Sequence, residues 1–276
     1  MMDRYAVLGN PVAHSKSPQI HAAFVLQTGE QMGYEALSIP TGEFTAGAND
    51  FIEAGGKGFN VTLPFKQEAW QWVNESKERA RLAGAVNTVS VDHGGRTTGH
   101  NTDGPGLITD ITNNQEWTIE GEEVLIVGAG GAVRGVLQSL LEARPNRLVI
   151  TNRTFGRATN LADEFKSMGN IVALQMDHLH DPFDLIINGT SASLQGQVPN
   201  LRPSIISDNC RCYDMMYAAH ATPFNRWATS QGATLSSDGL GMLVEQAALA
   251  FEIWRGIRPQ TKPVIDLVRA VLQKEQ

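Results

Sequence analysis

Short apolar runs alternate with amphipathic segments along much of the chain. The run at residues 5–8 is typical of a strand, and the run at 124–127 has the length and continuity of a strand that is buried on both faces. In the segment 133–141 the apolar residues instead recur every three or four positions, which is typical of an amphipathic helix. Because strands and helices alternate in this way, the pattern predicts an α/β fold with parallel strands and right-handed crossovers.

The first hundred residues form one predicted α/β unit. Ser17 and Pro18 mark the start of a helix, with Ser17 as its cap and Pro18 in its first turn. The other expected elements are strands at residues 5–8, 34–39 and 59–63, helices at 44–54 and 66–82, and a hairpin of residues 86–91 and 97–99 around the turn 93–95.

A second predicted unit opens near Glu123. Its expected elements are strands at residues 124–127, 148–150 and 185–187 and helices at 133–141 and 157–168, followed by a mainly helical end at 240–276. This alternation is typical of a Rossmann-like doubly wound domain, in which ligands bind at the carboxyl ends of the strands.

The composition excludes several classes of protein. With 22 Lys+Arg against 29 Asp+Glu, the net charge of −7 argues against a nucleic-acid partner, which normally needs a basic surface. No apolar run reaches the roughly 18 residues of a membrane span, and the N-terminus lacks the features of a signal peptide. We therefore expect a cytoplasmic protein with no membrane partner, in which Cys210 and Cys212 are buried, reduced thiols. No spacing of histidines or cysteines is typical of a metal site.

A glycine-rich turn joins the strand at 124–127 to the helix that follows it. In this context the pattern is typical of a dinucleotide site, because the first glycine permits a tight turn and the second lets backbone N–H groups approach a pyrophosphate. The third position of the motif is Val133 instead of glycine, so the match is imperfect, and a turn without a ligand is the alternative. The expected cofactor-binding residues of the turn are Gly128, Ala129, Gly130, Gly131 and Ala132.

The residues after the next strand favour NADP over NAD. Many NAD sites place an Asp or Glu there, which accepts hydrogen bonds from the ribose hydroxyls. This chain has Asn152, Arg153 and Thr154 instead, with Arg157 one helical turn further on. A guanidinium can bind a 2′-phosphate through two hydrogen bonds. The alternative is that the two arginines only form a solvated face.

Polar motifs in the first unit form the candidate substrate site. In an open α/β sheet, residues that follow strands can converge at one edge. A lysine at a helix start opposes the helix dipole, which makes a functional reason for Lys66 more plausible than a plain surface position. Hydroxyls, an amide, a cation and an anion together suit a small polyhydroxylated acid, and these groups come from Ser15, Ser17, Thr62, Lys66, Asn87 and Asp103.

Seven short motifs are spread along the chain: SKSP at 15–18, NVT at 60–62 with Pro64 and Lys66, AGAVNT at 83–88, NTDG at 101–104, GAGGA at 128–132 with Arg134, NRT at 152–154, and DGLGML at 238–243 with Gln246. By these motifs and their order, the sequence resembles the shikimate dehydrogenase family over essentially its whole length. The family often has Ala where this sequence has Gly189, and we expect this difference to be small.

The resemblance implies a reversible, NADP-dependent reduction of 3-dehydroshikimate to shikimate in aromatic amino-acid biosynthesis. It implies a substrate domain of residues 1–104 plus 239–276 and an NADP-binding domain of residues 105–238. Ser15 and Ser17 would bind the substrate carboxylate, and Tyr217 would help to close the pocket. The substrate hydroxyls would be bound by Thr62, Asn87, Asp103 and Gln246, and the cofactor path would be lined by Thr190, Ser191, Met215 and Gly239.

Lys66 and Asp103 are the expected catalytic pair. Reduction of a ketone creates alkoxide character that a positioned acid must protonate, and either Lys66 alone or the pair fits that role. Two alternatives to this function are a quinate/shikimate dehydrogenase with relaxed cofactor use and a non-catalytic NADP-binding regulator on the same fold. Either a monomer or a homodimer is expected.

Overall fold

The computed structural model describes residues 2–275, so the expected domain limits at residues 1 and 276 lie outside the described residues. The chain divides into two compact units. The first unit contains residues up to Gly106 and the segment Val244–Val268, and the second contains Leu107–Leu243 and the residues from Arg269 onward.

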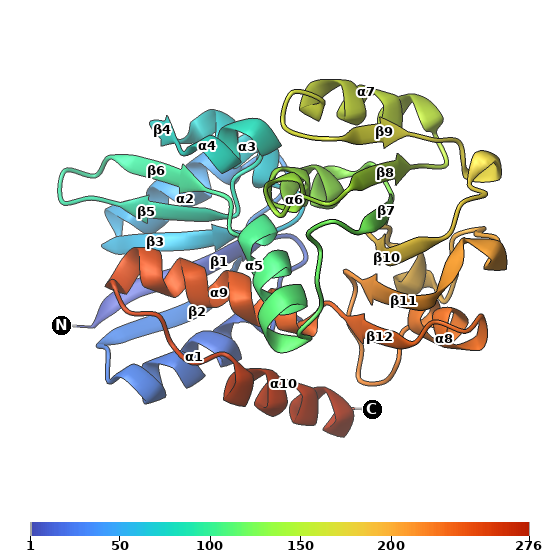
Figure 1. The fold of residues 1–276 in the computed structure, drawn as a ribbon. Helices are drawn as coiled ribbons and strands as arrows, with labels where there is room; N and C mark the ends of the chain where they lie inside the picture. Colours follow the sequence, from blue (N-terminus) through green and yellow to red (C-terminus); the bar gives the residue numbers. More distant parts are fainter. Residues whose placement is uncertain (1, 276) are drawn as a thin grey trace. The chain divides into compact units, whose positions relative to one another are not determined.

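A six-stranded mixed sheet forms the centre of the first unit (Figure 1). Strand β1 runs parallel to both β2 and β3, whereas β5 is antiparallel to β3 and to β6. The expected strands and hairpin are therefore confirmed, with displaced ends. In order across the sheet, the strands are β2 (Met32–Ser38), β1 (Asp3–Gly9), β3 (Gly56–Val61), β5 (Thr88–Val91), β6 (Thr97–His100) and β4 (Glu75–Ser76).

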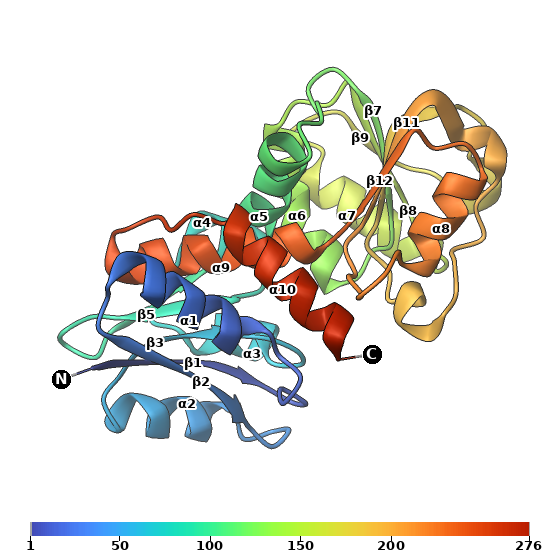
Figure 2. The same ribbon diagram turned by 90° about the horizontal axis from the view of Figure 1, so that it is seen from below.

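Helices cover both faces of this sheet. Figure 2 shows α1 (Ser17–Thr28) and α9 (Leu240–Arg255) on one face and α2 (Phe44–Glu53) on the other. Phe51 of helix α2 makes an edge contact with Phe59 of β3 within an apolar core. Helix α1 contains Pro18 in its first turn as expected, but Lys16 occupies the cap position and no side chain caps the helix. Ser17 is instead the first helical residue.

The prediction of a single helix at residues 66–82 is wrong. The chain forms α3 (Lys66–Trp72), the short strand β4, and α4 (Glu78–Ala83). Val73 is extended, and Asn74 exchanges hydrogen bonds with Thr97: the Asn74 N–H donates to Thr97 Oγ1 at 3.0 Å, and the Thr97 N–H donates to Asn74 Oδ1 at 2.8 Å. Pairing with β6 thus competes successfully with continuation of the helix.

The second unit contains a six-stranded sheet whose strand pairs are all parallel. The chain moves outward from β7 in one direction, then returns beside β7 and moves outward in the other direction, which is the strand order of a dinucleotide-binding Rossmann fold. The doubly wound fold is therefore confirmed. The order across the sheet is β12 (Leu235–Asp238), β11 (Ile206–Asp214), β10 (Phe183–Asn188), β7 (Glu123–Val127), β8 (Arg147–Thr151) and β9 (Ile171–Ala173).

Helices α6 (Gly131–Glu142) and α7 (Phe155–Phe165) lie on one face of this second sheet, and α8 (Pro223–Ser230) lies on the other (Figure 2). Cys210 and Cys212 are buried free thiols on β11, as expected. None of the described helices has the length and apolar character needed to cross a membrane. The remaining helical segments are α5 (Asp103–Thr109), a π-helical turn at Asp110–Asn114, α10 (Lys262–Lys274), and short 3-10 turns at Met176–His178, Ala192–Gln195 and Pro203–Ile205.

A fully buried histidine lies in the aromatic core of the first unit. His21 of α1 stacks on Tyr34 with ring centroids 4.0 Å apart and packs near Phe251 and Trp254 of α9. Neither ring nitrogen has a hydrogen-bond partner. Because burial penalises the charged imidazolium, the pKa of His21 is lowered to about 3.

This buried histidine predicts a specific loss of stability in acid. Between about pH 6.5, the ordinary histidine pKa, and pH 3, the unfolded chain binds a proton that the folded chain does not. The free energy of unfolding should therefore fall by about 1.4 kcal/mol per pH unit from this group as the pH falls through that window. His21→Phe keeps a stacked ring without a titratable group and should reduce the slope by about that amount in urea unfolding at pH 6, 5 and 4.

His93→Phe provides the matched control, because His93 is exposed in the turn between β5 and β6. Its slope should equal that of the wild type. Identical slopes for the wild type and His21→Phe would show that His21 does not titrate as its burial requires.

Candidate active site

Polar residues of the first unit meet at one edge of its sheet. Because β1 and β3 are parallel, the segments that follow them leave the sheet at the same edge. Strand β5 is antiparallel to β3, so the residue before β5 lies at that edge too, and β6 returns the chain to it. This topology explains how one edge collects Ser15, Ser17, Thr62, Lys66, Asn87 and Asp103.

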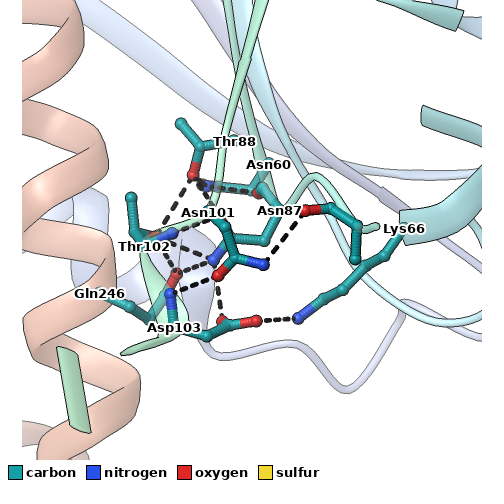
Figure 3. Close-up of polar contacts among 9 residues, drawn as sticks. Asn60, Lys66, Asn87, Thr88, Asn101, Thr102, Asp103 and Gln246 are labelled. Atoms are coloured by element: carbon teal, nitrogen blue, oxygen red, sulfur yellow. Dashed lines mark hydrogen bonds and ion pairs between the residues drawn. The ribbon is translucent and has the colours of Figure 1, made fainter. Parts of the chain in front are cut away.

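Lys66 and Asp103 form an ion pair, which we call the lysine–aspartate pair. The Lys66 Nζ lies 2.6 Å from Asp103 Oδ2 (Figure 3). Each residue is the first of a short helix, α3 and α5 respectively. The side chains remain 28% and 13% exposed, so the pair is partly desolvated yet accessible to a ligand. The carboxylate also offsets the unfavourable position of an ammonium group at a helix start.

The Asn87 amide fixes the second oxygen of Asp103. Asn87 Nδ2 donates to Asp103 Oδ1 and to Thr102 Oγ1, both at 2.8 Å. Its Oδ1 accepts from the Thr102 N–H at 2.8 Å and from the Thr88 hydroxyl at 3.0 Å. Because Asn87 is only 2% exposed and its donors and acceptor are all used, the amide has one favourable orientation.

Gln246 joins this cluster from α9, as Figure 3 shows. Its Oε1 lies 3.3 Å from Thr102 Oγ1 and 3.4 Å from Asn87 Nδ2. Gly106 allows the close approach of α9, since a Cβ there would lie 2.8 Å from the backbone nitrogen of Gln246. On the other side of the cluster, Asn101 Oδ1 accepts from the Asp103 N–H at 3.1 Å and orients the first turn of α5.

The two serines and Thr62 lie at the same edge without bonding to the lysine–aspartate pair. The Ser17 N–H donates to Ser15 Oγ at 3.3 Å. Ser17 also hydrogen-bonds through its side chain to Tyr34, whose hydroxyl donates to Asn60 Oδ1 at 2.6 Å. The Thr62 N–H donates to the Leu8 carbonyl at 2.9 Å, which holds the end of β3 beside β1. The side chains of these three residues are therefore placed by the backbone at the sheet edge.

The glycine-rich turn of the second unit fits a dinucleotide phosphate. Gly128 has φ 118°, a conformation that disfavours any side chain, and its N–H donates to the Thr151 carbonyl at 2.8 Å. Gly130 is extended and Gly131 begins the 12-residue helix α6. A Cβ at either glycine would meet no atom within 4 Å, so space is open beside the helix N-terminus. Unpaired N–H groups at such an end attract an anion. The other residues of the turn are Ala129 and Ala132.

The segment after β8 presents two exposed arginines. Asn152 Nδ2 donates to the Thr154 carbonyl at 2.9 Å and shapes the turn into α7. Arg153 and Arg157 are exposed, and no carboxylate of the described residues pairs with either. Their guanidinium groups are available to an anionic ligand beside the glycine-rich turn, whose Gly128 is hydrogen-bonded to the last residue of β8.

A buried carboxylate connects the segments that follow β10 and β11. Asp214 Oδ1 accepts from Asn188 Nδ2 at 3.0 Å and from the Met216 N–H at 3.1 Å, and Oδ2 accepts from Ser193 Oγ at 2.6 Å. Thr190 is connected to the same group of residues, because its hydroxyl donates to Asn188 Oδ1 at 2.7 Å. Burial raises the pKa of Asp214, and the hydrogen bonds to its carboxylate oppose that shift.

Met215 and Gly239 are in direct contact. A Cβ on Gly239 would lie 2.3 Å from the Met215 carbonyl oxygen, and the Gly239 N–H donates to the Met216 carbonyl at 3.1 Å. Ser191 directly follows Thr190, ahead of the 3-10 turn. Tyr217 lies in the second unit, where burial and Asp238 raise the pKa of its phenol. Its expected contribution to the substrate site stays a prediction.

The imperfect third position of the dinucleotide motif has a local explanation. Val133 is fully buried in α6, where the motif would place a glycine to let helix and strand pack closely. A Cβ on Gly189, just after β10, would lie 2.3 Å from Val133 Cγ2. The glycine that permits close packing is thus on the strand side of the contact instead of the helix side. A Cβ at position 189 would therefore require Val133 to move.

The chemistry of the two units defines a class of protein. A Rossmann fold with an open glycine-rich turn suits a dinucleotide, and an ammonium–carboxylate pair among hydroxyl and amide groups suits proton transfer on a small polar substrate. Together they are typical of a dinucleotide-dependent oxidoreductase.

Comparisons with known proteins agree with that class. The shikimate dehydrogenase substrate binding domain matches residues 7–89, shikimate / quinate 5-dehydrogenase matches 110–196, and the shikimate 5′-dehydrogenase C-terminal domain matches 239–269. The shikimate dehydrogenase (NADP(+)) of Alkalilimnicola ehrlichii is 50% identical over 98% of this chain and 99% of that protein, and that of Hahella chejuensis is 51% identical over 96% and 97%.

A solved structure extends the similarity to three dimensions. Shikimate 5-dehydrogenase from Thermus thermophilus, in complex with NADP(H) and shikimate, has a TM-score of 0.89 and 33% identity over 98% of this chain and 100% of that one. The chain belongs to the shikimate dehydrogenase family and is an enzyme.

Residue types and spacing alone did not single out several residues that hold the site together. Asn60, Thr88, Asn101 and Thr102 lie within or beside the motifs, and their role as hydrogen-bond scaffold depends on strand pairing. Tyr34 lies outside every motif. Its only local signal is a tyrosine inside a predicted strand, because a phenol that is partly buried needs a polar partner.

Because Gly189 makes room for Val133, a smaller side chain at position 133 should compensate for the loss of the glycine at position 189. Gly189→Ala alone should destabilise the protein by about 1–3 kcal/mol through overpacking against Val133 and should raise the KM for NADP+. Adding Val133→Ala removes the obstructing methyl groups and should restore most of both losses. Thermal unfolding and initial-rate kinetics measure the two effects.

Gly156→Ala provides the control, since Gly156 lies in α7 and a Cβ there would meet no atom within 4 Å. It should leave both properties unchanged. An undisturbed Gly189→Ala variant, or a double variant no better than Gly189→Ala alone, would contradict the packing explanation.

Proposed function

We propose that the protein is an NADP-dependent shikimate dehydrogenase, which reversibly reduces 3-dehydroshikimate to shikimate in aromatic amino-acid biosynthesis. The observation that carries the proposal is the lysine–aspartate pair at 2.6 Å, held by Asn87 and placed beside Gln246 in the first unit. Relatives about half identical to this chain over nearly its full length are named for this activity.

The first unit would bind the substrate. Ser15 and Ser17 offer hydroxyls at the start of α1, where a carboxylate is favoured by the helix dipole. Hydroxyls of the substrate would meet Thr62, Asn87, Asp103 and Gln246. A site that offers several directed donors and acceptors discriminates strongly against analogues that lack the matching hydroxyl, because its own polar groups would then remain unpaired.

Lys66 would handle the proton of the reacting oxygen. Its ammonium group can donate to the oxygen of the ketone as alkoxide character develops, and in the reverse direction the amine accepts the proton from the alcohol. Asp103 keeps the ammonium oriented through Oδ2 while Asn87 holds Oδ1. The arrangement favours the pair acting as one unit over Lys66 acting alone.

The second unit would bind NADP. When bound, the cofactor supplies or accepts the hydride. The pyrophosphate would lie against the turn from Gly128 to Ala132, and Arg153 and Arg157, with Asn152 and Thr154, would bind the 2′-phosphate. Thr190, Ser191, Met215 and Gly239 would line the path toward the nicotinamide, with Asp214 holding their segments in place.

A cytoplasmic location and a monomeric or homodimeric state complete the proposal. Two buried thiols that are not joined are typical of a reducing compartment. The net charge of −7 supports a small-molecule substrate instead of a nucleic acid.

A direct assay tests the proposed function. Reduction of NADP+ and of NAD+ is followed with shikimate and with quinate as separate substrates. We expect turnover with shikimate and NADP+ to exceed every other combination. Comparable rates with quinate or NAD+ would favour a quinate/shikimate dehydrogenase, and no turnover with any combination would favour a regulator.

Removing the ammonium group should abolish most of the turnover. We expect Lys66→Ala to lower kcat by about 100-fold or more, the usual scale for loss of a general acid or base. Lys77→Ala is the control, because Lys77 is an exposed lysine of the same unit that pairs with Glu75, and it should turn over normally. Near-normal turnover of Lys66→Ala would remove Lys66 from the mechanism.

Cofactor preference should depend on Arg153. Loss of a charge-assisted hydrogen bond is worth about 1.5–3 kcal/mol, so Arg153→Ala should raise the KM for NADPH roughly 10- to 100-fold while changing that for NADH little. Arg202→Ala, at an exposed arginine of the same unit, should leave both constants unchanged. Equal effects of Arg153→Ala on the two cofactors would reject phosphate recognition by this residue.

A further inference from the structure

A continuous chain of hydrogen bonds leads from β2 to the lysine–aspartate pair. It begins at Tyr34, whose hydroxyl donates to Asn60 Oδ1 at 2.6 Å. Ser17 is hydrogen-bonded to the same hydroxyl.

The later bonds continue from Asn60 through Thr88 and Asn87 to Asp103. Asn60 Nδ2 donates to Thr88 Oγ1 at 2.9 Å and to the Asn87 carbonyl at 3.1 Å, which uses both of its hydrogens. Thr88 accepts from Asn60 and can give its own hydrogen to Asn87 Oδ1 at 3.0 Å. Asn87 Nδ2 then donates to Asp103 Oδ1 at 2.8 Å. Figure 3 shows the part of this chain from Asn60 to Asp103.

The residues in the middle of this series of hydrogen bonds are buried, so water cannot easily replace a lost partner. Asn60, Asn87 and Thr88 are 6%, 2% and 0% exposed. In such a setting hydrogen bonds polarise one another, and a single unpaired group is costly. Loss of the first donor would leave Asn60 Oδ1 without its hydrogen bond from Tyr34, and the bonds from Asn60 to Thr88 and Asn87 would adjust.

Tyr34 is itself held in a fixed position and protonation state. Its ring stacks on His21 with 13° between the ring planes. Burial raises the pKa of Tyr34 well above the usual value of 10, so the phenol keeps its proton. Tyr34 is therefore a permanent donor at the start of the chain.

We propose that Tyr34 is a positioning residue for the reaction at Lys66 and Asp103. Its hydroxyl orients Asn60, Thr88 and Asn87 in turn, so that Asp103 receives an N–H at Oδ1 while Oδ2 stays directed at Lys66. The inference rests on the proposed function, because it takes the lysine–aspartate pair as the place of proton transfer.

Tyr34→Phe tests the proposal, since it keeps the ring on His21 and removes only the hydroxyl. We expect kcat with shikimate and NADP+ to fall about 5- to 20-fold, the scale of one buried hydrogen bond, while the KM for NADP+ stays within about twofold. Tyr5→Phe is the matched control. Tyr5 is a buried tyrosine of the same sheet, and its hydroxyl bonds to Arg255, which is not part of the hydrogen-bond series from Tyr34 to Asp103. The kcat of Tyr5→Phe should therefore not change.

A double-mutant cycle separates positioning from a general structural effect. Thr88→Val breaks the series of hydrogen bonds two residues beyond Tyr34, with Thr88→Ala as its replacement if the valine variant does not fold. If Tyr34 acts through Thr88, then adding Tyr34→Phe to the Thr88 variant should lower kcat no further. Independent, multiplicative losses would overturn the proposal, as would a Tyr34→Phe variant with the kcat of the wild type.

The wild-type rate distinguishes failure of this inference from failure of the proposed function. A wild-type protein without turnover on shikimate and NADP+ contradicts the function. A wild-type protein that turns over normally, together with an unaffected Tyr34→Phe variant, contradicts only the role of Tyr34.

Discussion

The carboxylate of Asp103 is held by two different donors, and the organisation of the first unit depends on this arrangement. Lys66 contacts one oxygen at 2.6 Å, and the Asn87 amide contacts the other at 2.8 Å. A carboxylate paired only with an ammonium group could rotate and solvate independently, because exposed ion pairs contribute little order. The second, buried donor fixes the plane of the carboxylate and with it the direction of the lysine. The remaining polar residues of the cluster hold Asn87 in the single orientation that makes this possible.

Strand direction brings these groups together from distant parts of the sequence. Lys66 follows a parallel strand, whereas Asn87 and Asp103 bracket an antiparallel hairpin that begins and ends at the same sheet edge. In the second unit an all-parallel sheet also brings residues from distant parts of the sequence to one edge, but by a different strand order. There the strand order reverses beside β7. The glycine-rich turn lies at the carboxyl end of β7, and the buried Asp214 lies at the carboxyl end of β11, with β10 between these two strands.

The elements with strong periodicity could be predicted from the sequence, and so could the convergence of polar motifs. The apolar run at 124–127, the helix after it and the hairpin around residues 93–95 depend on local pattern, and the structure contains all three. The helix expected at 66–82 is interrupted because Asn74 and Thr97, distant in sequence, satisfy each other's backbone. The Val133–Gly189 contact and the chain from Tyr34 are also long-range. A local sequence pattern does not indicate which distant residue a buried group will contact. These features could therefore be identified only from the three-dimensional structure.

The lysine–aspartate pair is the proposed place where the substrate oxygen exchanges its proton. A crystal structure of the protein with shikimate and NADP+ bound tests this most directly. We expect one ring hydroxyl of shikimate within about 3.2 Å of both Lys66 Nζ and the Asp103 carboxylate, with the Asn87–Asp103 hydrogen bond retained. Shikimate bound with no hydroxyl near Lys66, or bound only after Asp103 has turned away from Asn87, would contradict it.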